Sequence, residues 1–450
     1  MTSGAPPNVL YLHSHDTGRH VEPYGHAVPT PNLQRLADQG LLFRRAFAAS
    51  ATCSGSRAAL VTGQYPHLNG MMGLAHRGWR LREGRRHLVH TLRRAGYHSE
   101  LVGEQHVSAD PRELGYDRVH DIATNHVATV APLASARLAS GLPEPFFLSV
   151  GFFETHRRFF EPSTVHDALY SLPPAHLPDT PGVRRDVASF KASARSLDDG
   201  VGAVLGALDA AGLGPRTLVI CTTDHGLPFP GAKATLLDRG LGVMLIMRGP
   251  GGFEGGRVHD ALVSHLDLYP TLCRLAGLAP PEWLDGRSLL PLARGDVDRV
   301  RDALFAELTY HAAYEPQRAV RTERHNYVRR FEPREGPVLP NTDDGPTKDE
   351  LVGLGWDGWP VDLEQLYDLA LDPVEGRNLA DDPRHADVRA DLAARLDTWM
   401  RETGDPLLDG PVPLPAGAWA NGPDQASADD PPEQRGPPIG REAAANGRPA

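Results

Sequence analysis

The stretch TLVICTTDHG, residues 217–226, decides the fold class, because a short apolar run there stops abruptly at polar residues. A continuous run of this kind is typical of a strand that is buried on both faces of a sheet. The segment before it, residues 191–213, has the apolar spacing of a helix. A helix followed by a fully buried strand is the repeating unit of a parallel sheet, and Asp224 and His225 stand where this strand ends.

The same plan recurs in the first third of the chain. Residues 31–48 and residues 87–107 each read as a helix, a glycine and a strand. Two further runs, NVLYLHS (8–14) and EPFFLSVGFFETH (144–156), have the composition of buried strands. We therefore predict an α/β fold, with a mostly parallel sheet sandwiched by helices.

Four polar segments directly follow predicted strands: HSHD (13–16), GEQH (103–106), FETH (153–156) and TTDH (222–225). In parallel sheets, ligands bind beyond the carboxyl ends of the strands. A single histidine at a strand end is more often a surface or structural residue. Four such segments at one edge favour a functional site there.

The character of the chain changes after about residue 315. We predict a catalytic α/β domain over 1–315 and a smaller α+β subdomain with an antiparallel sheet and a helix over 316–407. Pro, Gly, Ala, Asp and Asn dominate residues 408–450, which predicts a disordered tail. Residues 332–350 read as a second flexible stretch, inserted between strand-like segments.

Composition excludes some classes of function. The 450 residues carry a formal net charge of −11, which argues against nucleic acid as a partner and leaves a small anionic substrate open if local cations outweigh the global charge. No apolar run is long enough for a membrane helix, and the first residues do not resemble a secretory signal. Three cysteines far apart do not resemble a disulfide framework, so a cytoplasmic location is expected.

One of these cysteines, Cys53, lies in a small polar cluster at the predicted start of a helix, ATCSGSRAALVTG (51–63). Helix N-termini hold anions and lower the pKa of a thiol. Arg57 follows four residues later and shares the helix face of Cys53. A nucleophile with an arginine one turn above it is a cradle for a tetrahedral oxyanion. The alternative is that Cys53 is a small buried residue and that Ser54 or Ser56 caps the helix.

The stretch CSGSRAALVTGQYPHLNG (53–70) resembles the sulfatase signature, Cys-x-Pro-Ser-Arg-x-x-x-x-Thr-Gly followed by Pro-His-x-x-Gly. Other family landmarks follow in the family's order, and the resemblance extends to about residue 402. It implies an alkaline-phosphatase-like fold and a hydrolase. The loop 229–233 and the stretch 309–322 are most similar to the heparan N-sulfatase (sulfamidase) branch. The remaining landmarks are residues 7–18, 95–107, 145–158, 222–240, 263–277 and 366–380.

The resemblance implies one divalent metal ion and an oxidised Cys53, the formylglycine of the family. His15 stands where the family usually has an aspartate. Calcium is the family's metal, whereas two imidazoles favour manganese or zinc. His13 is more typical of a strand residue that faces elsewhere. The implied metal ligands are His15, Asp16, Cys53, Asp224 and His225.

The resemblance also assigns catalytic roles. His156 would protonate the leaving group, and His106 would be the base that helps to release sulfate. Arg57 and Lys233 would stabilise the sulfuryl oxygens, with a solvated loop residue as the alternative for Lys233. The implied partners are a sulfate ester or sulfamate and the formylglycine-generating enzyme. Substrate-binding candidates are Glu104, His311 and Arg318, of which the last two are more typical of surface residues, and His67 reads as a turn anchor.

Two positions depart from the family pattern. Gly55 replaces the proline that the modifying enzyme normally reads, which leaves the conversion of Cys53 open. Glu104 replaces a lysine and so removes a cation from the sulfate pocket, where it could pair with Arg57 or Lys233. A carboxylate close to a sulfate costs on the order of several kcal/mol at intermediate dielectric, so this position can mark a changed substrate.

Three functions are compatible with these residues. The first is the hydrolysis of a sulfuric ester or sulfamate, from a sulfated sugar by analogy with the family. The second is a phosphoester or phosphonate monoester hydrolase with the same site. The third is a catalytically silent binding protein, which the number of retained polar site residues disfavours.

Overall fold

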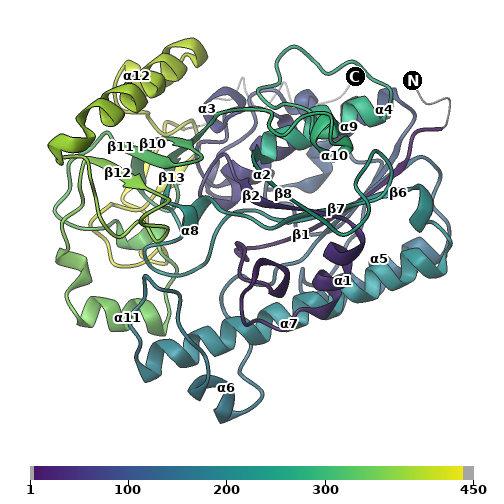
Figure 1. Cartoon of the computed structure of the whole chain (residues 1–450), viewed down its shortest axis with the longest axis horizontal. Helices are drawn as coiled ribbons and strands as arrows, with labels where there is room; N and C mark the ends of the chain where they lie inside the picture. Colours follow the sequence, from purple (N-terminus) through teal and green to yellow (C-terminus); the bar gives the residue numbers. More distant parts are fainter. Residues whose placement is uncertain (1–4, 439–450) are drawn as a thin grey trace.

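Eight strands form the central sheet of the computed structural model, which describes residues 5–438 (Figure 1). They are β1 (Asn8–Ser14), β2 (Leu41–Phe47), β3 (His98–Gly103), β4 (Arg118–Val119), β5 (Phe146–Gly151), β6 (Thr217–Thr223), β7 (Leu245–Arg248) and β8 (Arg257–Ser264). Their order across the sheet is β4-β3-β5-β1-β6-β7-β2-β8.

All pairings in this sheet are parallel except those of β7, which runs antiparallel to β6 and to β2. In the register, His13 of β1 lies opposite Gly151 of β5 and Thr222 of β6. Gly103 of β3 also lies opposite Gly151. Four strands therefore end together at one edge, and the predicted mostly parallel sheet is confirmed.

Helices cover both faces of the sheet, as predicted (Figure 1). Alternate residues of β1 supply the two cores, Val9 and Tyr11 on one face and Leu10 and Leu12 on the other. The face of Leu10 is covered by α1 (Pro31–Gln39), α5 (Val127–Ala139) and α7 (Pro181–Ala210). The face of Val9 is covered by α2 (Cys53–Thr62), α4 (Leu88–Arg94), α9 (Leu268–Leu275) and α10 (Leu290–Arg294).

A smaller antiparallel sheet follows in the order β12-β11-β10-β9. The predicted domain boundary at 315/316 falls inside β10, and the preceding strand, β9, already belongs to the small sheet. Helix α12 packs against this sheet, where Trp399 stacks on Phe305. The elements are β9 (Ala303–Tyr310), β10 (Tyr314–Thr322), β11 (His325–Arg330), β12 (Glu364–Asp368) and α12 (Ala386–Thr403). Short helices in the connections are α3 (Pro66–Asn69), α6 (Val165–Leu169), α8 (Asp238–Leu241) and α11 (Pro346–Gly353).

The segment 408–438 differs from the expected disorder, because it packs on the rest of the chain. Two short strands, β13 (Trp419–Ala420) and β14 (Gln434–Arg435), pair with each other. Asn421 is fully buried and accepts a hydrogen bond from Arg77, whose guanidinium lies over the Trp419 ring. A few anchor residues hold a segment whose average composition is that of a disordered chain. The rest of the predicted tail, 439–450, lies outside the described residues.

Within residues 5–438, no helix has both the length and the hydrophobicity needed to cross a membrane. Cys53, Cys221 and Cys273 are free thiols, and all three are buried. Cys53 is the first residue of α2, and its thiol is the one of the three that lies at the carboxyl edge of the central sheet.

Candidate functional site

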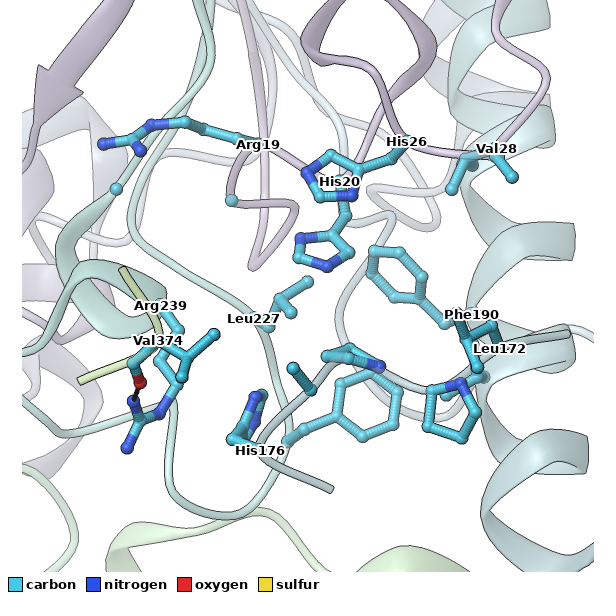
Figure 2. Close-up of a pocket in the computed structure, with 18 of the residues that line it drawn as sticks. Arg19, His20, His26, Val28, Leu172, His176, Phe190, Leu227, Arg239 and Val374 are labelled. Carbon is cyan, nitrogen blue, oxygen red and sulfur yellow. Dashed lines mark hydrogen bonds between the residues drawn. The ribbon is translucent and has the colours of Figure 1, made fainter. Parts of the chain in front are cut away.

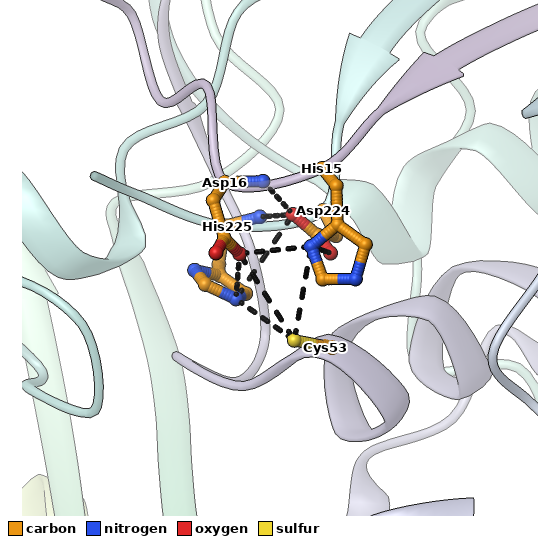
Figure 3. A group of neighbouring side chains, drawn as sticks. All are labelled: His15, Asp16, Cys53, Asp224 and His225. Atoms are coloured by element: carbon orange, nitrogen blue, oxygen red, sulfur yellow. Dashed lines mark hydrogen bonds and ion pairs between the residues drawn. The ribbon is translucent and has the colours of Figure 1, made fainter. Parts of the chain in front are cut away.

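Five side chains from three separate segments meet at the carboxyl edge of the sheet (Figure 3). His15 and Asp16 follow β1, Asp224 and His225 follow β6, and Cys53 begins α2. Each offers one possible ligand atom, and these atoms all lie within 4.8 Å of one another. All five residues are buried. The structure thus brings together the complete set of metal ligands that was predicted.

Local backbone geometry fixes the two aspartates. Asp16 has a φ of +57°, a left-handed conformation that aspartate tolerates better than most residues. Its backbone N–H donates to Asp224 Oδ1 at 2.8 Å, and the N–H of His225 donates to the same oxygen at 2.9 Å. One carboxylate oxygen therefore links the two strand ends.

Cys53 points from the first turn of α2 into this cluster (Figure 3). Its Sγ lies 3.4 Å from His225 Nε2, 3.9 Å from His15 Nδ1 and 4.0 Å from Asp16 Oδ1. Burial opposes the thiolate, but His15 and Lys233 hold the pKa of Cys53 well below its ordinary value. The site is therefore built to hold a negatively charged group at residue 53.

The donor atoms of the cluster fit a divalent ion. The nitrogen of His15 lies 2.9 Å from Asp16 Oδ1 and 3.1 Å from Asp224 Oδ2, and His225 Nε2 lies 2.9 Å from Asp16 Oδ1. Ligands about 2.0–2.2 Å from a metal stand roughly 3 Å apart, so small shifts would close this shell. Burial opposes ionisation of Asp224, but His15 and Arg57 lower its pKa to about 2, which keeps it in the form that ligates.

Arg57 supports the cluster from the next turn of α2. Its Nε and Nη2 lie 3.2 and 3.0 Å from Asp224 Oδ2, and Nη2 donates to the backbone oxygen of Ser14. Its Nη1 donates to His13 Nδ1 at 2.6 Å, so His13 carries its proton on Nε2, facing Ser149. His13 therefore holds Arg57 from the strand and stands outside the ligand group.

Lys233 is fully buried beside the cluster, which excludes the solvated-loop interpretation. Its ammonium donates to Asp16 Oδ2 at 2.8 Å and to Asp343 Oδ2 at 2.7 Å. Burial opposes the charge, but these two carboxylates raise the pKa of Lys233 well above its usual value. A fixed positive charge therefore stands next to Asp16.

Asp343 is the site residue that sequence reasoning missed. It belongs to 332–350, which was predicted to be a flexible insertion. Asn341 is buried there, accepts from the N–H of Ala313 at 2.8 Å and donates to Glu315 Oε2 at 2.8 Å. The only local signal was the pair of aspartates before a glycine, which is equally typical of a turn.

His156 reaches the cluster from the loop after β5. Its Nδ1 donates to the backbone oxygen of Arg157 at 2.6 Å, so Nε2 is the free ring nitrogen. That nitrogen lies 3.9 Å from Asp16 Oδ2. His156, Asp16 and Asp343 form a second cluster of possible ligand side chains, next to the first. Burial and the Lys233 ammonium lower the pKa of His156.

His106 stands further from the cluster. Its ring centroid is 6.0 Å from that of His15, and its Nε2 shares a 2.8 Å hydrogen bond with Nδ1 of His76. His76 is exposed, so the pair links the edge of the site to solvent.

Glu104 lies close to the site but makes no direct ion pair with Arg57 or Lys233 among the described residues, contrary to the predicted pairing. The reason is that Asp224 occupies Arg57, and two other carboxylates occupy Lys233. Glu104 instead accepts from Asn125 Nδ2 at 2.6 Å. Burial opposes its charge, but His106 and Arg57 lower the pKa of Glu104. An ionised carboxylate therefore faces the site from a short distance.

The two other substrate-binding candidates have different positions. His311 is buried near the thiol, and its pKa is lowered because burial outweighs the opposing effect of Cys53. It is therefore placed at the site and is no surface residue.

Arg318 corrects the prediction, because its guanidinium cannot reach a substrate. It is fully buried and donates to both oxygens of Asp405, at 2.5 and 2.9 Å, and to the backbone oxygen of Leu308. Glu307 lies 3.6 Å away and binds the backbone and ring nitrogens of His67. Arg318 thus joins the small sheet to the segment after α12, and Glu307 joins the same sheet to His67 of α3, so both have a structural role.

Comparisons with known proteins agree with this geometry. The family model described as Sulfatase matches residues 7–278, and the model described as N-sulphoglucosamine sulphohydrolase, C-terminal, matches residues 231–347. The chain is 31% identical to the N-sulphoglucosamine sulphohydrolase of Homo sapiens, over 90% of this chain and 92% of that protein. It is 28% identical to an ulvan-active sulfatase of Formosa agariphila, over 89% of this chain and 75% of that protein. The solved structure of a 2-O GAG sulfatase matches with a TM-score of 0.71 and 23% identity, over 96% of this chain and 99% of that one.

Proposed function

The chain belongs to the sulfatase family, and we propose that it is a metal-dependent and formylglycine-dependent hydrolase that releases inorganic sulfate from a sulfated sugar. The observation that carries the proposal is the position of Cys53. Its Sγ lies within 4.0 Å of His15, Asp16 and His225, at the start of a helix. A nucleophile and a set of metal ligands share one small volume.

The substrate class is proposed from the relatives. The human relative is named for N-sulphoglucosamine, and its C-terminal family model matches a region that contains Lys233 and Asp343. The other relative is named for ulvan. Both a sulfamate and a sulfate ester therefore belong to the proposal, and the sugar is the shared part.

The residues present fit the two groups that the family implies. His15, Asp16, Asp224 and His225 would hold the ion, with the oxidised side chain of residue 53 beside it. The ion would supply positive charge at the attacking oxygen, and the hydrated aldehyde would supply two hydroxyls on one carbon. Calcium is the family's metal, while the two imidazoles favour manganese or zinc.

The cations of the chain would bind the sulfuryl group. Lys233 is held rigidly by two carboxylates, and Arg57 by Asp224, so neither needs to reorganise during the reaction. Preorganised charges of this kind act where negative charge develops.

The histidines would move the protons. Because Nδ1 of His156 donates to a backbone oxygen, Nε2 is the nitrogen that can exchange a proton with the substrate. To act as the acid for the leaving oxygen or nitrogen, Nε2 would first have to take up a proton. His106 would accept a proton during sulfate release, and its hydrogen bond to the exposed His76 offers a route to solvent.

Turnover of an aryl sulfate and an aryl phosphate would test the proposal, after chelation and with Ca²⁺, Mn²⁺ or Zn²⁺ added back. Mass spectrometry of the Cys53 peptide, from the native organism or a host with the modifying enzyme, should show formylglycine. Cys53→Ala should abolish turnover, whereas Cys273→Ala, which removes a buried thiol of α9, should not.

The other outcomes would select another function. Preference for the phosphate would support a phosphoester or phosphonate hydrolase. An intact Cys53 with no turnover, together with tight binding of a sugar, would support a silent binding protein. The cytoplasmic location and the formylglycine-generating enzyme as partner stay predictions.

A further inference from the structure

A cavity of about 580 Å³ is lined by Gly18 and Leu227, which are two residues along the chain from Asp16 and His225 (Figure 2). Its walls are the loop 18–28, the segment 170–176, one side of α7, the loop 227–229 and the turn 373–375. None of the site residues described above lines it. Its size is that of a small-molecule pocket, and the proposed reaction does not use it.

The cavity has an apolar floor and an apolar rim. Phe190, Leu227 and Phe229 form the buried part. At the rim, Tyr170 and Leu172 are 84% and 76% exposed, although both are large apolar side chains. Exposed apolar side chains gathered around a hollow are typical of a ligand site. The apolar part of a bound ligand would cover the side chains of Tyr170 and Leu172.

The carboxylates in the lining are already paired. Asp238 lies 3.0 Å from Arg19 and 2.5 Å from Arg321. Glu375 accepts from Arg321 at 3.3 Å and from Asn326 at 2.7 Å. Both negative charges are thus matched by cations on the chain.

Two cations of the lining remain without such a match. Lys191 on α7 has no ion pair within residues 5–438, and Arg239 donates only to the backbone oxygens of Gly231 and Val374. In a chain with a net charge of −11, this is a locally positive cavity.

Three imidazoles supply hydrogen-bonding groups. His20 and His26 stack with their ring centroids 3.9 Å apart, and His176 lies across the hollow (Figure 2). The buried Nε2 of His176 has no hydrogen-bond partner in the described part of the chain. Imidazole rings in the wall add polar edges to a lining that is otherwise mostly apolar.

We propose that this cavity is a second ligand site, which binds a small amphipathic organic anion with an aromatic or acyl body. The body packs between Phe190 and Leu227, and the anionic head lies at Lys191. The loop 227–242 carries both this wall and Lys233, so the occupant stabilises a loop that also belongs to the catalytic site.

Calorimetric titration of 1-naphthoate into the whole chain tests this inference, with 1-naphthamide as the neutral analogue. We expect saturable binding of the carboxylate below about 1 mM, and binding of the amide weaker by about tenfold. Leu172→Asp and Lys191→Glu should each weaken naphthoate binding by about tenfold or more. Leu354→Asp is the matched control, because Leu354 is 68% exposed and lies outside the cavity.

Aryl sulfate turnover by these three variants should equal that of the unmodified chain, which shows that they fold. The inference is overturned if naphthoate does not bind, or if Leu172→Asp and Leu354→Asp have the same effect. It is also overturned if saturating inorganic sulfate displaces naphthoate one for one, because the anion would then sit in the catalytic site.

Discussion

The ammonium of Lys233 lies between two carboxylates, 2.8 Å from Asp16 Oδ2 and 2.7 Å from Asp343 Oδ2. Burial opposes the charge of Asp343, but Lys233 and His156 lower its pKa, so both carboxylates are ionised. A cation that would bind a sulfuryl oxygen is therefore partly neutralised before any substrate arrives. Asp343 therefore has two effects: it fixes the position of Lys233, and its negative charge weakens the attraction of this ammonium for any anion.

Asp343→Asn should strengthen inhibition by inorganic sulfate. The amide keeps an oxygen for Lys233 and removes one negative charge near the bound anion, so the inhibition constant should fall about tenfold. The measurement is aryl sulfate turnover at increasing sulfate. Asp344→Asn is the control, because Asp344 binds Lys348 at 2.6 Å and should leave the constant unchanged. Weaker inhibition in Asp343→Asn would mean that the charge of Asp343 is needed to position Lys233.

Glu104→Lys should raise kcat/KM for simple aryl sulfates, by about tenfold, because it replaces an ionised carboxylate near Arg57 by a cation. Glu104→Gln, which only removes the charge, should produce a smaller rise. Steady-state kinetics on the same aryl sulfate compare the three proteins. A loss of activity in both variants would show that the carboxylate is an integral part of this enzyme's substrate recognition.

The sequence was sufficient for the central sheet and for most of the site, for a physical reason. A buried parallel strand is written locally, as an apolar run that stops at polar residues, and the carboxyl ends of such strands meet at one edge. His15, Asp16, Asp224 and His225 could be placed together on that ground. Cys53 needed the resemblance to a family, since a cysteine at a helix start is ambiguous alone.

Asp343 and the segment 408–438 could not be found in this way. Their order comes from single buried residues with partners far along the chain, such as Asn341 with Glu315 and Asn421 with Arg77. A composition rule averages over such anchors and predicts disorder. The prediction for Arg318 was wrong for a related reason, because its partner, Asp405, is 87 residues away along the chain.

Arg318→Met should destabilise the protein without changing substrate affinity. The variant leaves Asp405 buried without its bidentate partner, which costs about 3–5 kcal/mol in the free energy of unfolding. Urea unfolding measures this cost. Arg329→Met, on the same sheet, breaks a partly exposed pair with Asp397 of α12 and should cost less than about 1 kcal/mol. A raised KM with unchanged stability in Arg318→Met would restore Arg318 as a substrate contact.

The environment of Glu100 leads us to expect that the protein loses stability at acidic pH. Burial opposes its charge, but hydrogen bonds from Arg137, His120 and His98 lower its pKa from 4.5 to about 2. A carboxyl whose pKa is depressed in the folded state stabilises the fold above its unfolded pKa. That contribution, about 1–3 kcal/mol, is lost as the pH falls from about 4.5 to about 2.

Glu100→Gln should therefore be less stable than the unmodified protein at pH 7, and the gap in unfolding free energy should close as the pH falls below about 4.5. The exposed Glu113→Gln should follow the unmodified protein at every pH. A gap that stays constant with pH would assign the effect to packing.

Gly55→Pro should increase the fraction of Cys53 that is converted to formylglycine. Cys53 is only 2% exposed, so conversion has to precede folding, and it reports on the local sequence of the unfolded chain. In the folded state, a Cβ at residue 55 would stand 2.9 Å from Ser50 Oγ and 3.0 Å from Thr52 Oγ1. These hydroxyls can move, and a proline in the first helical turn removes an N–H that lacks a helical partner, so the cost in stability should be about 1 kcal/mol.

Gly55→Ala is the matched control, because it adds the same Cβ without the proline ring. Mass spectrometry of the peptide that carries Cys53, after expression with the modifying enzyme, should show more aldehyde in Gly55→Pro than in Gly55→Ala or the unmodified chain. Activity per mole of aldehyde should stay constant among the three, because the substitution acts before the site has folded. Equal conversion in all three would mean that the modifying enzyme does not read this position, and that Gly55 is no obstacle to an active site at Cys53.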